Sequence, residues 1–183
     1  MAGLMSRSEA LRALLLRHRG RDPTEERDRE RVLALLERDE GAFDRHRWSP
    51  GHITASAFVV DPGRRQLLLI HHAKLGMWLQ PGGHVDPEDA DVAAAARREL
   101  WEEAGIEVSA GAGTLLQVDI HRIPARPDQP THEHFDVRWL FTIERREARA
   151  GSDALAARWV SLDDLAQVDT DDSVRRAAAH IPA

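Results

Sequence analysis

The first part of the chain carries apolar residues at the spacing of amphipathic helices. Two segments, 8–19 and 23–40, place such residues three and four positions apart, at Leu11, Leu14, Leu15, Val32, Leu33, Leu35 and Leu36. In the second segment Asp22 can cap the helix, Pro23 suits its first turn, and Gly41 can end it. We therefore predict two helices, which either form a partner-binding or dimerisation arm or pack on the rest of the protein. We favour packing.

From about residue 50 the pattern changes to that of β-strands. Segment 52–60 is rich in β-branched residues, 61–63 is a turn signal, and 65–72 is the predicted partner strand. Three further strands are predicted at 78–83, 114–123 and 134–144, and a strand followed by a Ser-capped helical turn at 157–166. These strands predict a substantial sheet.

Helices are fewer in this second part of the chain. They are predicted at 89–104, which Gly105 ends as a C-cap, and at 171–180. Several strands with few helices, not in strict alternation, indicate a mixed α+β sandwich rather than a doubly wound sheet. We therefore divide the chain into a two-helix extension at 1–48, packed on the core, and a main domain at 49–183.

Composition narrows the classes of protein and site. With 42% hydrophobic and 31% charged residues, the 183-residue chain has the balance of a soluble globular domain. It has no cysteine, which excludes disulfides, thiolate zinc sites and cysteine nucleophiles. The net charge of −6 disfavours general nucleic-acid binding, and apolar runs such as 67–70 are too short to span a bilayer. We therefore expect a cytoplasmic protein without membrane contact.

Three glutamates, Glu99, Glu102 and Glu103, stand close together near the end of the predicted helix 89–104. At about 100° per residue they share one side of the helix, where like charges repel by roughly 0.2–0.5 kcal/mol per pair. The helix dipole also disfavours acids at this end. Convergent carboxylates suit a hard divalent cation such as Mg²⁺, which takes oxygen ligands. The alternative is a solvated acidic surface, but the unfavourable placement leads us to favour a metal site.

The residues around these glutamates resemble a known motif. "PGG" at 81–83 followed by "RRELWEEAGI" at 97–106 is similar to the Nudix box, here spanning 82–106. Its second half, Arg-Glu-apolar-x-Glu-Glu-x-Gly-apolar, matches without a gap at Arg98, Glu99, Leu100, Glu102, Glu103, Gly105 and Ile106. The chain thus resembles the Nudix hydrolase superfamily, and within it a bacterial subgroup.

This resemblance implies a fold, a reaction and a set of site residues. The fold is the Nudix-type α/β/α sandwich with a mixed sheet. The reaction is Mg²⁺-dependent cleavage, with Mn²⁺ as an alternative metal, of a diphosphate linkage in a nucleoside triphosphate or in a nucleoside diphosphate linked to another group. The implied metal ligands are Glu99, Glu102, Glu103 and the Gly83 carbonyl, and Glu102 or Glu103 would also act as general base.

The loop of the box is one residue longer than the family pattern. When five residues intervene after Gly83, the next position is Asp89 rather than glutamate, and eight residues rather than seven then separate it from Arg98. If Glu88 is taken as the first acid instead, four residues separate it from Gly83 and nine residues separate it from Arg98. In the family this first acid pairs with the box arginine and holds the loop against the helix. Either Glu88 or Asp89 can fill this role with Arg98.

Several further residues are candidates for contacts with substrate or metal. His84 and Lys74, the only lysine, flank the glycine turn, and Glu133 and Asp136 can supply a further acid. For each, the alternative is an ordinary polar residue of a loop or strand edge. Six histidines also invite a metal-site interpretation, but they show no recognised zinc spacing, so we favour ordinary roles for them: His52, His71, His72, His84, His132 and His134.

The alternative to a hydrolase is a Nudix-like domain that has lost catalysis and binds a nucleotide as a sensor or regulatory module. Such a domain is expected to lose its ligating glutamates, whereas this chain retains all three. No P-loop or Gly-x-Gly-x-x-Gly motif supports another nucleotide-binding fold. We therefore predict an enzyme that acts on a small nucleoside phosphate. The commonest oligomer of soluble proteins is a homodimer, so we consider a homodimer as the assembly of this protein.

Overall fold

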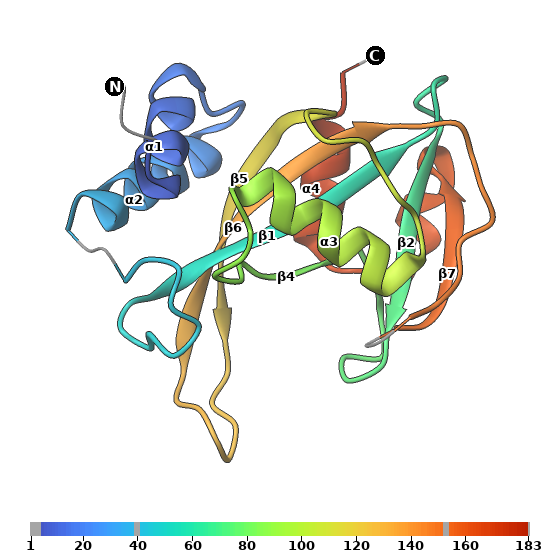
Figure 1. Ribbon diagram of the computed structural model, residues 1–183. Helices are drawn as coiled ribbons and strands as arrows, with labels where there is room; N and C mark the ends of the chain where they lie inside the picture. Colours follow the sequence, from blue (N-terminus) through green and yellow to red (C-terminus); the bar gives the residue numbers. More distant parts are fainter. Residues whose placement is uncertain (1–4, 39–40, 152–153, 183) are drawn as a thin grey trace.

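A seven-stranded mixed β-sheet forms the centre of the protein (Figure 1). The computed structural model describes residues 5–38, 41–151 and 154–182 of the chain. The main strand order is β3-β2-β1-β6-β5, while β4 pairs with β1 and β7 pairs with β2. β1 and β6 run parallel, and the other pairs are antiparallel. The strands are β1 (Gly51–Val60), β2 (Gln66–His72), β3 (Trp78–Leu79), β4 (Gly82–His84), β5 (Thr114–Ile123), β6 (His132–Thr142) and β7 (Ala154–Ser161).

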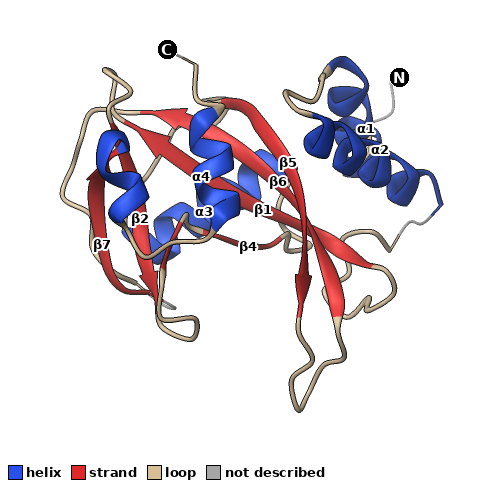
Figure 2. Ribbon diagram, turned by 180° about the vertical axis from the view of Figure 1, so that it is seen from behind, coloured by secondary structure: helices blue, strands red, loops and turns tan. Residues whose placement is uncertain are grey.

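Helices cover both faces of this sheet. They are α1 (Arg7–Arg17), α2 (Pro23–Arg38), α3 (Val92–Ala104), the 3₁₀ helix η1 (Leu162–Gln167) and α4 (Asp172–Ala179). Leu100 of α3 is buried with Ile53 in one apolar cluster, and Val174 of α4 is buried with Phe58 in another. Figure 2, turned from the view of Figure 1, shows α4 in front of the sheet and α3 behind it. The three layers confirm the predicted α+β sandwich.

Local chemistry explains where the long helix of the box begins and ends. The sequence predicts a start at residue 89, but α3 begins at Val92 because the Asp91 side chain accepts a hydrogen bond from the Ala94 amide and caps it. Gly105 ends the helix in the left-handed conformation, with φ of 65°, as predicted. Residues 39–40, at the end of the predicted second helix, lie outside the described residues.

The predicted strands correspond to observed ones, with small shifts. β5 has the predicted bounds 114–123, and β6 begins two residues before the predicted start at residue 134. The predicted strand 78–83 consists of the two short strands β3 and β4. Pro81 lies between them, and it lacks the amide hydrogen that a ladder position requires.

The N-terminal helices lie beside β5, at the outer edge of the sheet (Figures 1 and 2). An edge strand carries backbone groups that no neighbouring strand pairs. Two buried carboxylates of α2 satisfy two of them: Glu25 accepts the Val118 amide at 3.2 Å, and Asp28 accepts the Ile120 amide at 3.2 Å. The extension thus contacts the sheet directly. Within the described ranges, no helix has both the length and the apolar character needed to span a membrane.

Candidate active site

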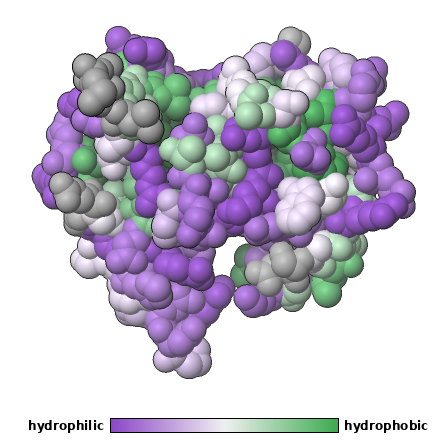
Figure 3. All heavy atoms as spheres, in the orientation of Figure 1, coloured by the Kyte–Doolittle hydropathy of each residue, from purple (hydrophilic) through white to green (hydrophobic). Residues whose placement is uncertain are grey.

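A cavity of about 520 Å³ lies where α3, β4 and the β5–β6 hairpin meet. The hairpin projects from the body of the protein in Figure 1, and hydrophilic residues cover much of the face shown in Figure 3. Most of the lining is polar or charged, so the space suits an ionic ligand. The lining residues include Arg45, Thr54, Ser56, Lys74, Gly82, Gly83, His84, Asp86, Arg98, Glu99, Glu102, Glu103, Arg126, His134 and Asp136.

The three glutamates of α3 line this cavity at different depths. Glu103 is 4% exposed, and its Oε2 accepts a hydrogen bond of 2.9 Å from the Gly82 amide. The side chains of Glu99 and Glu102 are 13% and 37% exposed, and Arg98 donates to them at 2.9 and 3.1 Å. Burial raises the pKa of Glu99 although the Arg98 charge opposes this. The positive charge of Arg98 therefore compensates only part of the negative charge that the three glutamates bring to one end of the cavity.

The loop before α3 is held to the helix by Arg98. Its guanidinium donates to both oxygens of Asp89 at 2.9 to 3.3 Å and to the His84 carbonyl at 2.8 Å. Asp89 is buried, whereas Glu88 is exposed to solvent. Asp89, and not Glu88, is therefore the partner of Arg98. The extra loop residue leaves this contact in place.

Gly82 and Gly83 bring the backbone close to the glutamates. Neither has a positive φ, so what these positions require is space rather than a special backbone conformation. A Cβ on Gly82 would lie 2.5 Å from the Ser56 Oγ and 2.8 Å from the Ala55 carbonyl oxygen. A Cβ on Gly83 would lie 2.5 Å from the Glu99 Oε1. The absence of side chains therefore keeps the space beside Glu99 open.

The donor set at this end of the cavity fits a hard divalent cation. Carboxylate and carbonyl oxygens are the ligands that Mg²⁺ and Mn²⁺ prefer. The structure brings all three glutamates to the same lining as Gly83, whose small size leaves room next to Glu99. The residues expected from the sequence to hold a metal therefore line one cavity.

Comparison with known proteins identifies the family. A model of the NUDIX domain matches residues 50–180 of the chain. The chain belongs to the Nudix family. Phosphatase NudJ of Escherichia coli (strain K12) is 33% identical over 122 residues, which cover 63% of this chain and 72% of NudJ. The same identity and coverage are found with Phosphatase NudJ of Shigella flexneri.

Solved Nudix structures agree with this membership. The MutT NUDIX hydrolase of Burkholderia pseudomallei is 30% identical, with a TM-score of 0.57, over 71% of this chain and 97% of its own. The NUDIX domain of Shewanella oneidensis NrtR, solved with ADP ribose, has a TM-score of 0.56 over 80% of this chain and 92% of its own; at 17% identity it shows the fold alone. The protein is thus a Nudix pyrophosphohydrolase, of a family that acts on small nucleotide-derived substrates.

Asp136 of the Nudix domain lies in the cavity lining but is held by its neighbours. It is 1% exposed and accepts hydrogen bonds from Ser56 at 2.8 and 2.9 Å and from Thr54 at 3.2 Å. The Arg138 guanidinium, also 1% exposed, donates to it at 3.0 Å. Asp136 therefore helps to organise the floor of the cavity through a buried polar network.

The remaining candidates of the Nudix domain separate into two groups. His84 and Lys74 line the cavity. Burial, together with the positive charge of Arg45, lowers the pKa of His84 to about 4, so this imidazole is neutral near pH 7. Glu133 is not among the lining residues, and its carboxylate pairs with Arg31 of α2 at 2.5 Å. It belongs to the contact between the N-terminal helices and the sheet.

Reasoning from the sequence missed several of the residues that line the cavity. Thr54 and Ser56 alternate along β1 with buried apolar residues, and this alternation was the available signal for a polar strand face. Arg45, Asp86 and Arg126 come from loops, where no periodicity indicates direction. Their placement depends on how the loops fold back over the sheet.

Proposed function

We propose that the protein is a Mg²⁺-dependent hydrolase that cleaves a diphosphate linkage in a nucleoside triphosphate, or in a nucleoside diphosphate linked to another group, by attack of water on phosphorus. One observation carries the proposal: the three glutamates of α3 line the same cavity as the Gly82–Gly83 turn. Three positively charged side chains, Arg45, Lys74 and Arg126, also line it. Positive groups in the same cavity as an acidic cluster that can hold a cation suit a chain of phosphates.

Glu99, Glu102, Glu103 and the Gly83 carbonyl would hold Mg²⁺, with Mn²⁺ as the alternative. When bound, such a cation neutralises phosphate oxygens and lowers the pKa of a coordinated water. Arg98 bridges Glu99 and Glu102 at 2.9 and 3.1 Å and so limits their mutual repulsion. Its role is to position these carboxylates.

We assign the general base to Glu102. Glu103 is 4% exposed, and the side chain of Glu99 is 13% exposed. The Glu102 side chain is 37% exposed and has the best access to a water in the cavity. On the substrate side, His84 and Lys74 would contact the phosphates. Asp136, which lines the cavity, stays a proposed substrate contact, and so does Glu133, although Glu133 is not among the lining residues and its carboxylate pairs with Arg31.

A phosphate-release screen tests this function. The purified full chain is incubated with nucleoside triphosphates in the presence of inorganic pyrophosphatase, which converts released pyrophosphate to phosphate. It is also incubated with sugar nucleotides, ADP-ribose and dinucleoside polyphosphates in the presence of alkaline phosphatase, which releases phosphate from the phosphomonoester products. We expect turnover of at least one substrate with Mg²⁺ or Mn²⁺ and loss of that turnover with EDTA. Silence across the panel with both metals, combined with retained nucleotide binding, would instead favour the sensor or regulatory module.

Three coarser expectations accompany this proposal. We propose that residues 1–48 form an extension and that residues 49–183 form the Nudix domain, a boundary that the family match at 50–180 supports. A homodimer stays a prediction, and light scattering of the purified chain tests it. The cytoplasmic location also stays a prediction, and fractionation of the source cells tests it.

A further inference from the structure

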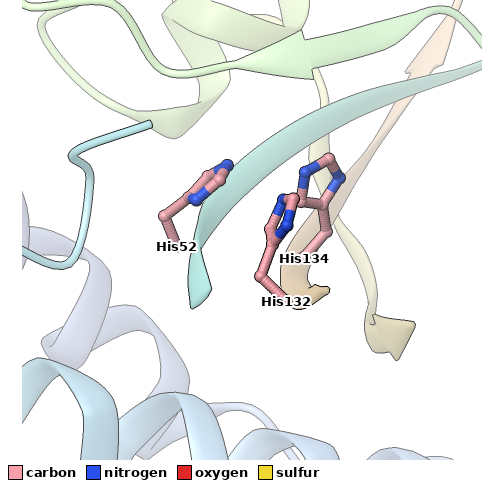
Figure 4. A group of neighbouring side chains, drawn as sticks. All are labelled: His52, His132 and His134. Carbon is pink, nitrogen blue, oxygen red and sulfur yellow. The ribbon is translucent and has the colours of Figure 1, made fainter. Parts of the chain in front are cut away.

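Three histidines from two parallel strands come together beside the cavity (Figure 4). They are His52 of β1 and His132 and His134 of β6. The strand register places His52 directly opposite His134, and His132 is two residues away on the same strand face. One nitrogen of each ring lies within 4.8 Å of one nitrogen of both other rings. The ring centroids are 4.9 to 5.2 Å apart.

Hydrogen bonds determine which nitrogen of two of these rings carries the proton. The Nδ1 of His52 lies 3.1 Å from the Arg47 carbonyl oxygen, and the Nδ1 of His132 lies 2.9 Å from the Pro130 carbonyl oxygen. A carbonyl oxygen only accepts, so each Nδ1 must donate its hydrogen. In the neutral ring the Nε2 then bears a free lone pair. Metal-ligating histidines are oriented by this type of bond to a backbone carbonyl.

The lone pairs so produced have no partner among the described residues. The Nε2 atoms of His52 and His132 are both buried without a hydrogen bond. The two residues are 0% and 3% exposed, and the Trp48 ring packs edge-on against His132 with centroids 4.7 Å apart. Buried polar atoms are almost always hydrogen-bonded, so two unpartnered acceptors point to a ligand that accepts an electron pair or donates a hydrogen.

We propose that His52, His132 and His134 bind one divalent transition-metal ion of the Zn²⁺ class, at a site separate from the carboxylates of α3. Imidazole nitrogens suit Zn²⁺, Ni²⁺ and Cu²⁺, whereas Mg²⁺ prefers oxygen. Three nitrogens at about 2.05 Å from a tetrahedral ion lie about 3.4 Å apart, so the rings need to close in by less than about 1.5 Å.

Three protein ligands leave the fourth position of a tetrahedral ion open. Of the three histidines, His134 lines the cavity, and the neighbouring His84, whose ring centroid is 5.1 Å from that of His52, lines it as well. His134 therefore connects the cluster to the cavity, and a water or a phosphate oxygen from the cavity would be the fourth ligand. The ion would also tie the start of β1 to the start of β6, beside the hairpin loop that carries Arg126.

Cobalt binding to the purified full chain tests this site. The protein is stripped with a chelator and titrated with Co²⁺ in the presence of excess Mg²⁺, which occupies the carboxylate site. We expect one equivalent of Co²⁺ to bind, to give the visible bands of a nitrogen-ligated ion, and to be displaced by Zn²⁺. His132→Gln and the less buried His134→Gln should each weaken binding by at least about tenfold. His71→Gln, on β2 and outside the cluster, is the matched control and should keep wild-type affinity.

Two results would overturn the proposal. One is the absence of saturable Co²⁺ binding by the wild-type chain under excess Mg²⁺. The other is a visible signal that Glu102→Gln abolishes and the histidine variants keep, since this places the ion at the carboxylates. Nitrogen NMR of the wild-type histidines during Zn²⁺ addition gives an answer that needs no variant: the Nε2 resonances of His52 and His132 and one ring-nitrogen resonance of His134 should shift together. Unshifted resonances at saturating Zn²⁺ would also contradict the site.

Discussion

The Arg98 guanidinium donates three hydrogen bonds, of 2.9 to 3.3 Å, to the carboxylate of Asp89. The same guanidinium bonds the His84 carbonyl at 2.8 Å, so it closes the loop of the box onto α3. The loop accommodates its additional residue because Glu88 turns to solvent while Asp89 is buried against the helix. Much of the active-site geometry therefore depends on this one pair.

Replacing Asp89 with alanine should reduce both stability and activity. Loss of charge-assisted bonds to a partly buried arginine is expected to destabilise the protein by about 1–3 kcal/mol. Because a freed Arg98 no longer holds the carboxylates in place, kcat/KM should fall by about 10–100-fold. Thermal unfolding and the phosphate-release assay measure the two effects. Glu88→Ala is the control, and equal effects from the two variants would contradict the assigned pairing.

Glu103→Gln should abolish most of the turnover without unfolding the protein. The amide oxygen of glutamine can still accept the Gly82 amide, but the charge that attracts the cation is gone. Changes to residues that orient the ligands of a metal cost about 10–100-fold, so loss of a ligand itself should cost at least about 100-fold in kcat. Circular dichroism should show an unchanged fold. Glu107→Gln, at an exposed position beyond the helix, should keep wild-type turnover; wild-type turnover in Glu103→Gln would remove Glu103 from the ligand set.

The two glycines of the turn should respond differently to alanine. A Cβ at Gly82 meets the backbone oxygen of Ala55 at 2.8 Å, which cannot move without shifting β1, so Gly82→Ala should lose about 1–3 kcal/mol of stability. A Cβ at Gly83 meets the end of the flexible Glu99 side chain at 2.5 Å. Gly83→Ala should therefore lower activity more than stability, since Glu99 can rotate away. Urea unfolding measures the stability of both variants, and steady-state kinetics measures their activity. A larger loss of stability in Gly83→Ala than in Gly82→Ala would contradict these predicted Cβ contacts.

The contact between α2 and β5 should make stability depend on pH. Burial acts to raise the pKa of Glu25, but hydrogen bonds from His18 and from the Arg21 and Val118 amides offset this, and the pKa lies below 4.5. A lowered pKa means that the stabilisation is present above pH 4.5 and is lost as the pH falls through the folded-state value. Urea unfolding at successive pH values should show a decline in the free energy of unfolding below pH 4.5.

Variants of α2 isolate this contribution. Glu25→Gln should cost about 1–3 kcal/mol at neutral pH and flatten the acid decline. Burial raises the pKa of Asp28, so protonation of this side chain at low pH stabilises the folded protein. Asp28→Asn removes this effect and should make the free energy of unfolding fall more steeply with decreasing pH. Glu30 is exposed on the same helix, so Glu30→Ala should change neither the stability at neutral pH nor the decline in stability at low pH. An unchanged pH profile in both Glu25→Gln and Asp28→Asn would show that these carboxylates do not control acid stability.

The strands, the helices and the acidic helix face could be predicted because each depends on residues that are close in sequence. The period of β5 and the caps of α3 are local properties, and so is the spacing that puts Glu99, Glu102 and Glu103 on one side of a helix. The motif around them then pointed to the family. Local spacing did not identify the partner of Arg98. Glu88 and Asp89 are adjacent in the sequence, and only the folded loop decides which of the two side chains points toward the helix.

The tertiary structure decided what depends on strand register and loop path. His52 and His134 are far apart in the chain. The parallel pairing of β1 and β6 places them opposite one another, which local sequence spacing does not predict. The burial of Asp136 beside Arg138 and the distance of Glu133 from the cavity have the same origin. Sequence periodicity specifies which face of an element is polar, whereas the contacts between faces arise only when the whole sheet assembles.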